Sequence, residues 1–371
     1  MHPPLYLDYA ATTPPDPRVI QKMLENLSIY GNASSSHFLG KQAKLEIENA
    51  RMQVADLIKA IPEEIIWTSG ATESNNLALK GAALLYQSKG KHIVTMKTEH
   101  ASVLATCFQL EKQGFSVTYL APTADGLLDF EQFKNALRPD TILVSIMHVN
   151  NETGVIQDIK KLAEETANRG ILFHTDATQS IGKLPFNIED IPVDLISFSA
   201  HKMYGPKGIG ALYIRRKPRV RLFAEIHGGG QEQGMRSGTL PTHQIVGMGE
   251  ACAIAKNEMT LLYPKLFLLR EKFLQAFPQA KIHGDVKNAF PGIVNISFPD
   301  NIATSLMNKL PELAFSVGSA CLSKSDEPSH VLHAMGLSSE DCLHAMRFSF
   351  GSLTTVDDLQ FAITLLQKAL I

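Results

Sequence analysis

Cysteine is scarce in this chain. Its 371 residues include four cysteines, at positions 107, 252, 321 and 342. No two of them form a Cys-x-x-Cys pair, and four are too few for a disulfide framework in a chain of this length, so we interpret each as a free thiol. Cys107 and Cys252, and by the same reasoning Cys342, are predicted to be small core residues. Only Cys321 lies in a polar, loop-like stretch, GSACLSKSDEPSH.

The chain also lacks a strong charge and a long apolar run. Its formal net charge of −2 and pI near 6.7 exclude a sequence-wide attraction to nucleic acid or anionic membranes, and we interpret the basic run at 214–222 as solvated surface. The amino terminus has no basic start followed by an apolar stretch, and no segment approaches the ~18 apolar residues of a spanning helix. We therefore expect a cytoplasmic protein with no membrane partner, no direct nucleic-acid partner and no metal site.

Strand-length apolar runs alternate with amphipathic stretches of helical length from about residue 64 to residue 176. This alternation is typical of βαβ units and predicts an α/β fold with a mainly parallel sheet flanked by helices. From about His243 the pattern changes to long helical stretches and then to short strands, which indicates a smaller α+β domain. We expect a large domain over 15–257 and a small domain formed by 1–14 and 258–371.

Polar residues follow three of the predicted strands. WTSGATESNN places Ser69 to Thr72 between a strand and a helix expected to begin near Glu73, where backbone N–H groups could hold a phosphate. FHTDATQSIG and SFSAHKMYG place Asp176 and Lys202 at two further strand ends. Ligands of parallel sheets bind at such ends. A lysine that forms a Schiff base, a carboxylate for the ring nitrogen and a phosphate cradle together suggest pyridoxal phosphate chemistry.

Long segments spread over nearly the whole chain strengthen this interpretation. They include YLDYAATTPPDPRV, TSGATESNN, KTEHASVL, MHVNNETGVIQDI, HTDATQSIGKLP, SFSAHKMYGPKGIGALY, HGGGQEQGMRSGTLP, GSACLS and MRFSFG. In this order they resemble the cysteine desulfurases of the NifS/IscS type, in the class V aminotransferase family. The resemblance implies the pyridoxal-phosphate fold type I with a seven-stranded large-domain sheet, pyridoxal 5′-phosphate as cofactor, and a homodimer.

The same resemblance implies roles for the central residues. Lys202 would anchor the cofactor, Asp176 would pair with its ring nitrogen, and Gln179 would donate to its ring oxygen. His100 would stack on the ring and move protons. Cys321 would take sulfur from L-cysteine as a persulfide, leaving L-alanine, and would then deliver the sulfur to an acceptor protein. A cysteine in a loop suits both tasks, because it must reach first into the site and then out of it.

The remaining roles concern the phosphate and the substrate. Arg347 would bind the substrate carboxylate, because its guanidinium can form a bidentate pair, and Asn151 would lie beside both cofactor and substrate. Thr239 would reach the phosphate of the neighbouring subunit. The phosphate ligands implied within one subunit are Ala71, Thr72, Ser199 and His201.

Several departures from the family pattern bear on the sulfur acceptor. Val317 stands where a small polar residue is usual, Leu322 follows the nucleophile, and FPDNIATSL lacks the usual acidic pattern. The chain ends at Ile371, where housekeeping relatives extend into a tail that docks the iron–sulfur scaffold protein. We expect an acceptor such as an iron–sulfur scaffold or a tRNA-thiolation protein. Two alternatives stay open: a catalytically weak paralogue acting as a regulatory or binding partner, and a β-eliminating lyase or aminotransferase that uses Lys202 and Asp176 without Cys321.

Overall fold

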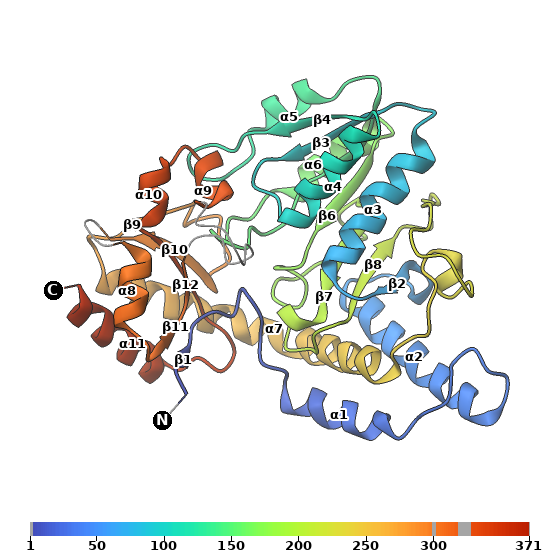
Figure 1. Cartoon of the computed structure of the whole chain (residues 1–371), viewed down its shortest axis with the longest axis horizontal. Helices are drawn as coiled ribbons and strands as arrows, with labels where there is room; N and C mark the ends of the chain where they lie inside the picture. The colour runs from blue at the N-terminus through green and yellow to red at the C-terminus, as the bar shows by residue number, and fades with distance from the viewer. Residues whose placement is uncertain (1–2, 299–301, 318–327, 371) are drawn as a thin grey trace.

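The computed structural model describes residues 3–298, 302–317 and 328–370 of the chain. It has two bodies of secondary structure, each built around its own sheet, which a long helix joins (Figure 1). Cys321 and Leu322, in the loop predicted around the nucleophile, lie outside the described residues. No described helix combines the length and apolarity needed to cross a membrane.

The larger sheet has seven strands and is mainly parallel, which confirms the prediction. Its order is β2-β8-β7-β6-β5-β3-β4, and only β8 runs antiparallel to its neighbours β2 and β7. The strands are β2 (Ile65–Thr68), β3 (His92–Met96), β4 (Ser116–Leu120), β5 (Thr141–Ser145), β6 (Leu172–Asp176), β7 (Leu195–Ser199) and β8 (Gly210–Ile214). All but β4 and the first residue of β6 are buried throughout, because helices cover both faces.

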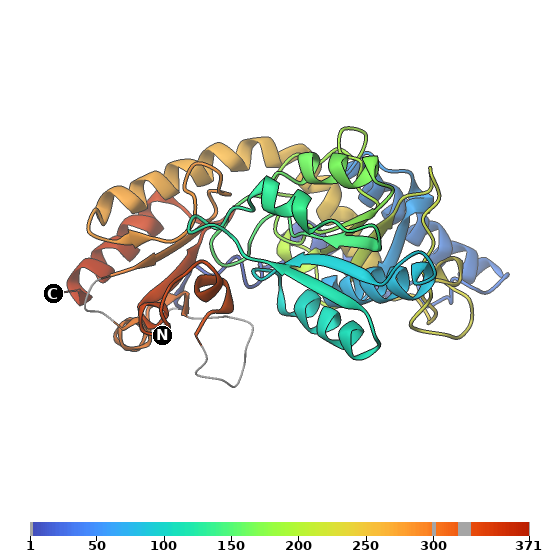
Figure 2. The same cartoon turned by 90° about the horizontal axis from the view of Figure 1, so that it is seen from above.

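Two separate apolar layers lie on the two faces of this sheet (Figure 2). Alternate strand residues point to opposite faces, so Ile65 and Trp67 join one layer and Ile66 joins the other. The helices α3 (Ala71–Tyr86) and α4 (Ala101–Lys112) complete one layer. The other is completed by α2 (Phe38–Leu57), α5 (Phe130–Ala136), α6 (Ile159–Asn168) and the first half of α7 (Thr242–Ala276).

The smaller body has its own core around an antiparallel sheet of order β12-β13-β10-β9. A parallel pair of β1 with β11 brings the start of the chain beside it. The strands are β1 (Leu5–Tyr6), β9 (Lys281–Ile282), β10 (Ile293–Ser297), β11 (Leu313–Ala314), β12 (Ser316–Val317) and β13 (Ala345–Ser349). The helices are α8 (Ala303–Lys309), α9 (His330–Ala334), α10 (Ser339–Leu343) and α11 (Val356–Ala369).

The helix α7 spans 35 residues and contributes to both cores. The sequence predicted long helical stretches from about His243, and the structure makes this region one helix that continues across Pro264. Proline removes one intrahelical hydrogen bond, but each half of α7 is held by packing against a different core. The predicted domain boundary between residues 257 and 258 falls inside α7, and that division stays a prediction.

The remaining elements are α1 (Pro17–Leu27) and three short 3₁₀ helices, η1 (Pro62–Glu64), η2 (Ala200–Lys202) and η3 (Glu232–Gly234). The helix α1 packs on α7 at the outside of the larger body (Figure 1). Of these elements, η2 matters most for the site, because it carries Lys202 directly beyond β7.

Candidate active site

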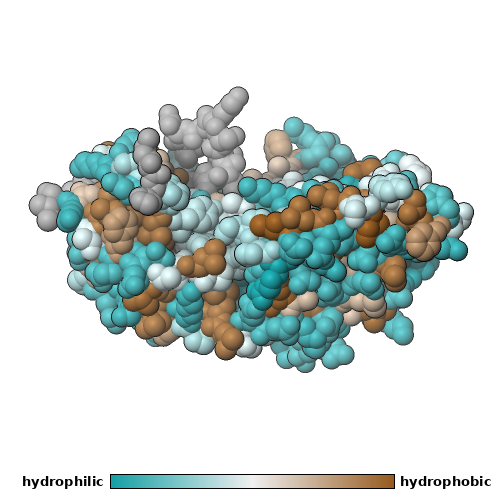
Figure 3. Space-filling view, turned by 90° about the horizontal axis from the view of Figure 1, so that it is seen from below, coloured by the Kyte–Doolittle hydropathy of each residue, from teal (hydrophilic) through white to brown (hydrophobic). Residues whose placement is uncertain are grey.

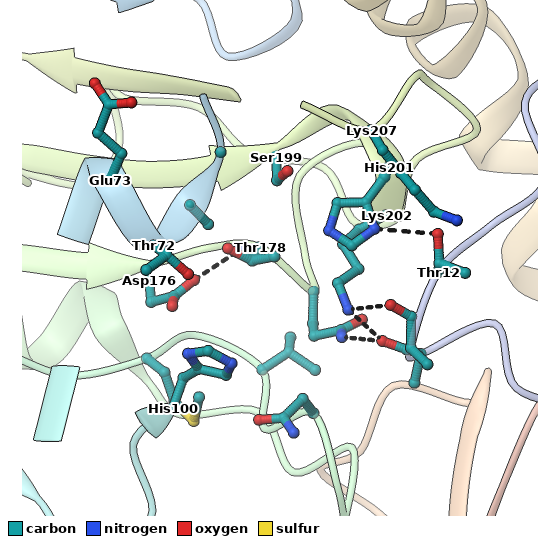
Figure 4. A pocket seen from close by; sticks show the side chains of 18 of the residues that line it. Thr12, Thr72, Glu73, His100, Asp176, Thr178, Ser199, His201, Lys202 and Lys207 are labelled. Atoms are coloured by element: carbon teal, nitrogen blue, oxygen red, sulfur yellow. Dashed lines mark hydrogen bonds between the residues drawn. The ribbon is translucent and has the colours of Figure 1, made fainter. Parts of the chain in front are cut away.

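A cavity of about 560 Å³ opens where strands of the larger sheet end and the smaller body begins. Such a volume is ordinary for a small-molecule site. Figure 4 shows His100, Asp176, Ser199, His201 and Lys202 surrounding one space, although they come from different elements. Ten of the residues predicted for the site line this cavity: Ala71, Thr72, His100, Asn151, Asp176, Gln179, Ser199, His201, Lys202 and Arg347.

One end of the cavity is formed by the first turn of α3. The helix begins at Ala71, two residues earlier than expected, and no side chain caps it. Its N-cap, Gly70, has φ 154° and ψ 176°, a conformation that glycine adopts far more readily than other residues. The uncapped N–H groups of Ala71 and Thr72 therefore lie at the positive end of a helix beside the cavity, which suits a phosphate.

Ser199 and His201 line the same cavity from β7 and η2. Ser199 is buried, and His201 Nδ1 lies 3.1 Å from Thr12 Oγ1. Burial, together with the charges of Lys202, Lys183 and Lys207, lowers the pKa of His201 to about 4. The imidazole is therefore neutral near pH 7, and it can serve an anionic ligand as a hydrogen-bond donor but not as a charge.

Lys202 projects from η2 toward the amino-terminal segment of the chain. Its Nζ donates to the carbonyl oxygens of Ala10 and Ala11, each at 2.7 Å (Figure 4). These carbonyls hold the ammonium at the cavity wall. The start of the chain reaches this point because β1 pairs with β11, and the residues that follow β1 line the cavity.

Asp176 ends β6 and is buried. Its Oδ2 accepts a hydrogen bond from Asn75 Nδ2 at 2.8 Å, and its Oδ1 accepts one from Thr178 N at 3.0 Å. Both contacts come from donors, so they hold the two carboxylate oxygens in place as acceptors. A carboxylate held in this way at a strand end can accept a further N–H from a ligand in the cavity.

His100 is the N-cap of α4, and it is linked to Asp176 by hydrogen bonds. Asn75 Nδ2 also donates to Ser102 Oγ at 2.9 Å, and that hydroxyl lies 2.8 Å from His100 Nδ1. Nδ1 additionally accepts from Ser102 N at 3.1 Å. Because Nδ1 is an acceptor, the proton of the neutral ring is carried by Nε2. The local structure thus selects one tautomer of a cavity-lining histidine.

Gln179 lines the cavity three residues beyond the end of β6 and is buried. Its Nε2 donates to Ala10 O at 2.8 Å, the same carbonyl that Lys202 contacts. Its Oε1 accepts from Lys183 Nζ at 2.7 Å. Gln179 is therefore held at both ends of its amide.

Arg347 reaches the cavity from β13 of the smaller sheet and is nearly fully buried. Its Nη2 donates to Asp8 Oδ1 at 2.7 Å and to Ser316 Oγ at 2.9 Å, and its Nη1 donates to Asn151 O at 2.9 Å. Its Nε is buried and has no partner among the described atoms. Three of the five N–H groups of the guanidinium thus set its orientation, and the Nε–H is one that could serve an anionic ligand.

Two of the predicted site residues are not placed in the cavity. Thr239 is exposed and does not line it. The loop that carries Thr239 is nevertheless tied to α3, because Arg236 Nε donates to Glu73 Oε1 at 2.8 Å. Cys321 lies outside the described residues.

The three described cysteines are buried, as predicted. Burial raises the pKa of Cys107 to about 12, and it raises the pKa values of Cys252 and Cys342 as well. A thiol acts as a nucleophile in its ionised form. None of these three therefore has the properties of a reactive cysteine.

Comparison with known proteins identifies relatives of this chain. A family model described as "Aminotransferase class-V" matches residues 5–361. The chain belongs to the class-V aminotransferase family. It is 54% identical to "Cysteine desulfurase IscS" of Pectobacterium atrosepticum, over 99% of this chain and 93% of that protein, and equally so to the protein of the same name from Escherichia coli.

Solved structures of class-V relatives share the fold. A "NIFS-LIKE PROTEIN" superimposes with a TM-score of 0.93 at 36% identity, covering 99% of both chains. A second structure, "SspA in complex with cysteine", gives a TM-score of 0.82 at 39% identity, covering 94% of this chain and 99% of that one.

The class-V family depends on pyridoxal 5′-phosphate, and the cavity suits this group. The uncapped start of α3 fits a phosphate. Asp176 offers a fixed acceptor, and Arg347 Nε and Thr178 Oγ1 are buried polar atoms without partners among the described atoms. An anionic ligand with a protonated ring nitrogen matches these features.

Several residues that build the site were not among those predicted from the sequence. Asp8 orients Arg347, Asn75 links Asp176 to His100, and Lys183 holds Gln179. Asn75 and Lys183 were visible as polar residues in stretches that become buried, in TSGATESNN and QSIGKLP. The pairing of Asp8 with Arg347 joins residues 339 positions apart and left no local signal.

Proposed function

We propose that this chain is a pyridoxal-phosphate-dependent cysteine desulfurase, which converts L-cysteine to L-alanine and collects the sulfur as a persulfide on Cys321. The observation that carries the proposal is the convergence of Lys202, Asp176 and the uncapped start of α3 on one cavity. The substrate follows from the 54% identity to proteins named cysteine desulfurase over 99% of this chain.

Each residue around the cavity would bind a different part of the cofactor. Lys202 would form the covalent linkage, Asp176 would accept from the ring nitrogen, and Gln179 would donate to the ring oxygen. The phosphate would bind the N–H groups of Ala71 and Thr72, with the Thr72, Ser199 and His201 side chains beside it. When bound, pyridoxal phosphate withdraws electrons from the substrate, which makes the α-proton removable and the sulfur open to attack.

The substrate would be held from the opposite body of the molecule. The carboxylate of L-cysteine would bind Arg347, whose orientation is already fixed by Asp8, Ser316 and the carbonyl of Asn151. His100 would lie over the cofactor ring with its proton on Nε2, where it can be given to the substrate. The Asn75 and Ser102 contacts keep that proton on the correct nitrogen.

Sulfur transfer would occur at Cys321. Its thiolate would attack the sulfur of bound L-cysteine, the carbon–sulfur bond would break, and a sulfur–sulfur bond would form. The electron pair of the broken bond and a proton would remain with the three-carbon product, which leaves as L-alanine. No external oxidant is needed, because the carbon is reduced by two electrons while the transferred sulfur is oxidised by two.

The active form would be a homodimer. The helix α1 exposes Ile20, Leu24 and Leu27, with 44%, 57% and 57% of each residue accessible, along one face. Figure 3 shows apolar side chains gathered among hydrophilic ones on the lower side of the molecule, on which Figure 1 places α1. The exposed Thr239 would reach the phosphate of the second subunit, as the resemblance to the family implies.

The acceptor of the sulfur would be a protein of the cytoplasm. An iron–sulfur scaffold or a tRNA-thiolation protein fits the relatives' name, IscS, and neither requires this chain to contact nucleic acid or a membrane. The interaction would take place at the Cys321 loop, since the sulfur must be handed over there.

The test combines cofactor chemistry with thiol mapping. The purified protein should be yellow and should lose the reducible covalent linkage in Lys202→Ala. After incubation with L-cysteine, mass spectrometry should find the extra sulfur on Cys321, and Cys321→Ser should form no persulfide while still binding L-cysteine. Cys107→Ala is the matched control and should keep the persulfide.

Other outcomes would select the alternatives. Alanine production at the parent rate by Cys321→Ser would contradict the desulfurase assignment, and sulfide with pyruvate as products would indicate a β-eliminating lyase. Bound cofactor with no persulfide on any cysteine of the parent protein would favour a regulatory paralogue.

A further inference from the structure

Lys183 is a buried lysine behind the cavity. It follows β6 by seven residues, and only 6% of its surface is accessible. Its Nζ donates to Gln179 Oε1 at 2.7 Å and lies 5.7 Å from the centre of the Phe290 ring. Phe290 belongs to the smaller body's core, so Lys183 lies at the junction of the two bodies.

The ammonium of Lys183 forms no ion pair with any described carboxylate. Two acidic side chains of the site are engaged elsewhere, since Asp8 pairs with Arg347 and Asp176 accepts from Asn75 and a backbone N–H. A buried charge without a counter-ion is costly, and buried ionisable groups with perturbed pKa values cluster at functional sites.

Positive charge accumulates in this part of the molecule. Burial, followed by the charges of Lys202 and Arg347, lowers the pKa of Lys183 to about 7. The three side chains approach from β13, from η2 and from the segment after β6. An anion bound in the cavity would stabilise the charged forms of all three side chains, so the cluster suits a negatively charged ligand, beside which Lys183 would carry its proton.

The contact with Lys183 also decides which way the Gln179 amide points. An ammonium group has donors and no acceptor, so the amide atom that faces it must be the oxygen. The Nε2 of Gln179 is consequently turned to the other side, where it donates to Ala10 O beside Lys202. A neutral apolar side chain at position 183 would remove the hydrogen bond that fixes this orientation of the Gln179 amide.

We propose that Lys183 is a positioning residue for the bound cofactor: it holds the Gln179 N–H toward the cofactor's ring oxygen and adds a positive charge behind that oxygen. The inference rests on the proposed function, because it takes the cavity as the pyridoxal phosphate site. It assigns Lys183 no contact with the reacting atoms.

A positive charge behind the ring oxygen has a measurable consequence at the nitrogen that links Lys202 to the cofactor. That nitrogen is harder to protonate when another cation lies near, so its pKa is lower with Lys183 than without it. Visible absorption of the bound cofactor reports this protonation. Removal of one charge several ångströms away should raise the pH midpoint of the absorption change by about one.

The experiment compares pH titrations of the visible absorption in the parent holoenzyme and in four variants. Lys183→Met removes the charge at similar side-chain volume, and Lys183→Gln does so with a polar group. Lys183→Arg keeps the charge. Lys160→Met, at an exposed position on α6, is the matched control for losing a lysine elsewhere. Both neutral variants should show the raised midpoint, whereas the arginine and control variants should titrate like the parent.

A second readout tests whether Lys183 acts through Gln179. The dissociation constant of pyridoxal phosphate is measured by adding it back to protein from which it has been removed. It should rise about 10-fold in Lys183→Met, as expected when a charge-assisted hydrogen bond is lost. In a Gln179→Leu background the same change should have a clearly smaller effect, because only the charge of Lys183 then remains to be lost. Independent effects of the two substitutions would indicate a merely structural lysine.

The outcomes separate this inference from the proposed function. If the parent protein forms no covalent linkage with pyridoxal phosphate, the proposed function fails and no comparison of variants can save it. If the parent does so and both neutral variants keep the parent's midpoint, or lower it, the role of Lys183 is refuted. If Lys183→Met does not fold, Lys183→Gln replaces it in the titration and in the double-mutant cycle with Gln179→Leu.

Discussion

Lys183 makes a prediction about stability that needs no cofactor. Its pKa of about 7 in the folded protein lies below the ordinary value of 10.5. Between these two values the unfolded chain binds a proton at Lys183 that the folded chain does not bind. Stability therefore rises with pH across this window, and it falls as the pH decreases toward 7.

The size of the effect follows from the same two values. For one group with pKa values of about 7 folded and 10.5 unfolded, linkage gives a gain of about 2 kcal/mol in the free energy of unfolding between pH 7 and pH 9. The substitution Lys183→Met removes the titrating group and should remove this gain. The free energy of unfolding of the variant, relative to that of the parent, should accordingly be higher at pH 7 than at pH 9.

The measurement is urea denaturation of the cofactor-free protein at both pH values, for the parent, Lys183→Met and the exposed control Lys160→Met. Other groups also titrate over this range, but they do so equally in parent and variant, so the difference between the two proteins isolates Lys183. A parent-minus-variant difference that is the same at pH 7 and pH 9 would show that the buried amine has an ordinary pKa, and would refute the reasoning.

Two further predictions concern buried arginines. Arg347→Lys should raise the KM for L-cysteine about 10- to 100-fold at unchanged cofactor content, because a lysine cannot reproduce the guanidinium contacts; steady-state kinetics with a parent-like KM would contradict this. Arg51 forms two hydrogen bonds of 2.8 Å with buried Glu232, so Glu232→Gln should lower the free energy of unfolding by about 3 kcal/mol; denaturation showing a loss below about 1 kcal/mol would contradict the buried-pair argument.

Much of the fold is predictable from local pattern. Between residues 64 and 176 the strands β2 to β6 coincide with the strand-length apolar runs, and the helices α3 to α6 lie in the stretches between them. These features depend on neighbours within a few positions, through side-chain periodicity and caps. The start of α3 was placed two residues late, because the conformation of Gly70 depends on tertiary packing.

The site is predictable in its parts but not in its connections. Asp176 and Lys202 were recognised because strand ends of a parallel sheet are where ligands bind, and the chain order alone indicates those ends. The resemblance to class-V enzymes added His100, Gln179 and Arg347. Nothing local indicated that the carbonyl of Ala10 would hold both Lys202 and Gln179.

The amino-acid sequence by itself determined the class of fold, the strand ends that bear chemistry, and the cysteines that lie in the core. Only the tertiary structure decided which polar groups share a partner: Asp8 with Arg347, Asn75 with both Asp176 and Ser102, and Lys183 with Gln179. Periodicity records whether a residue faces the core. Hydrogen bonds between residues far apart in the chain depend on how whole elements pack, and that packing sets the tautomer, the amide orientation and the charge of the site.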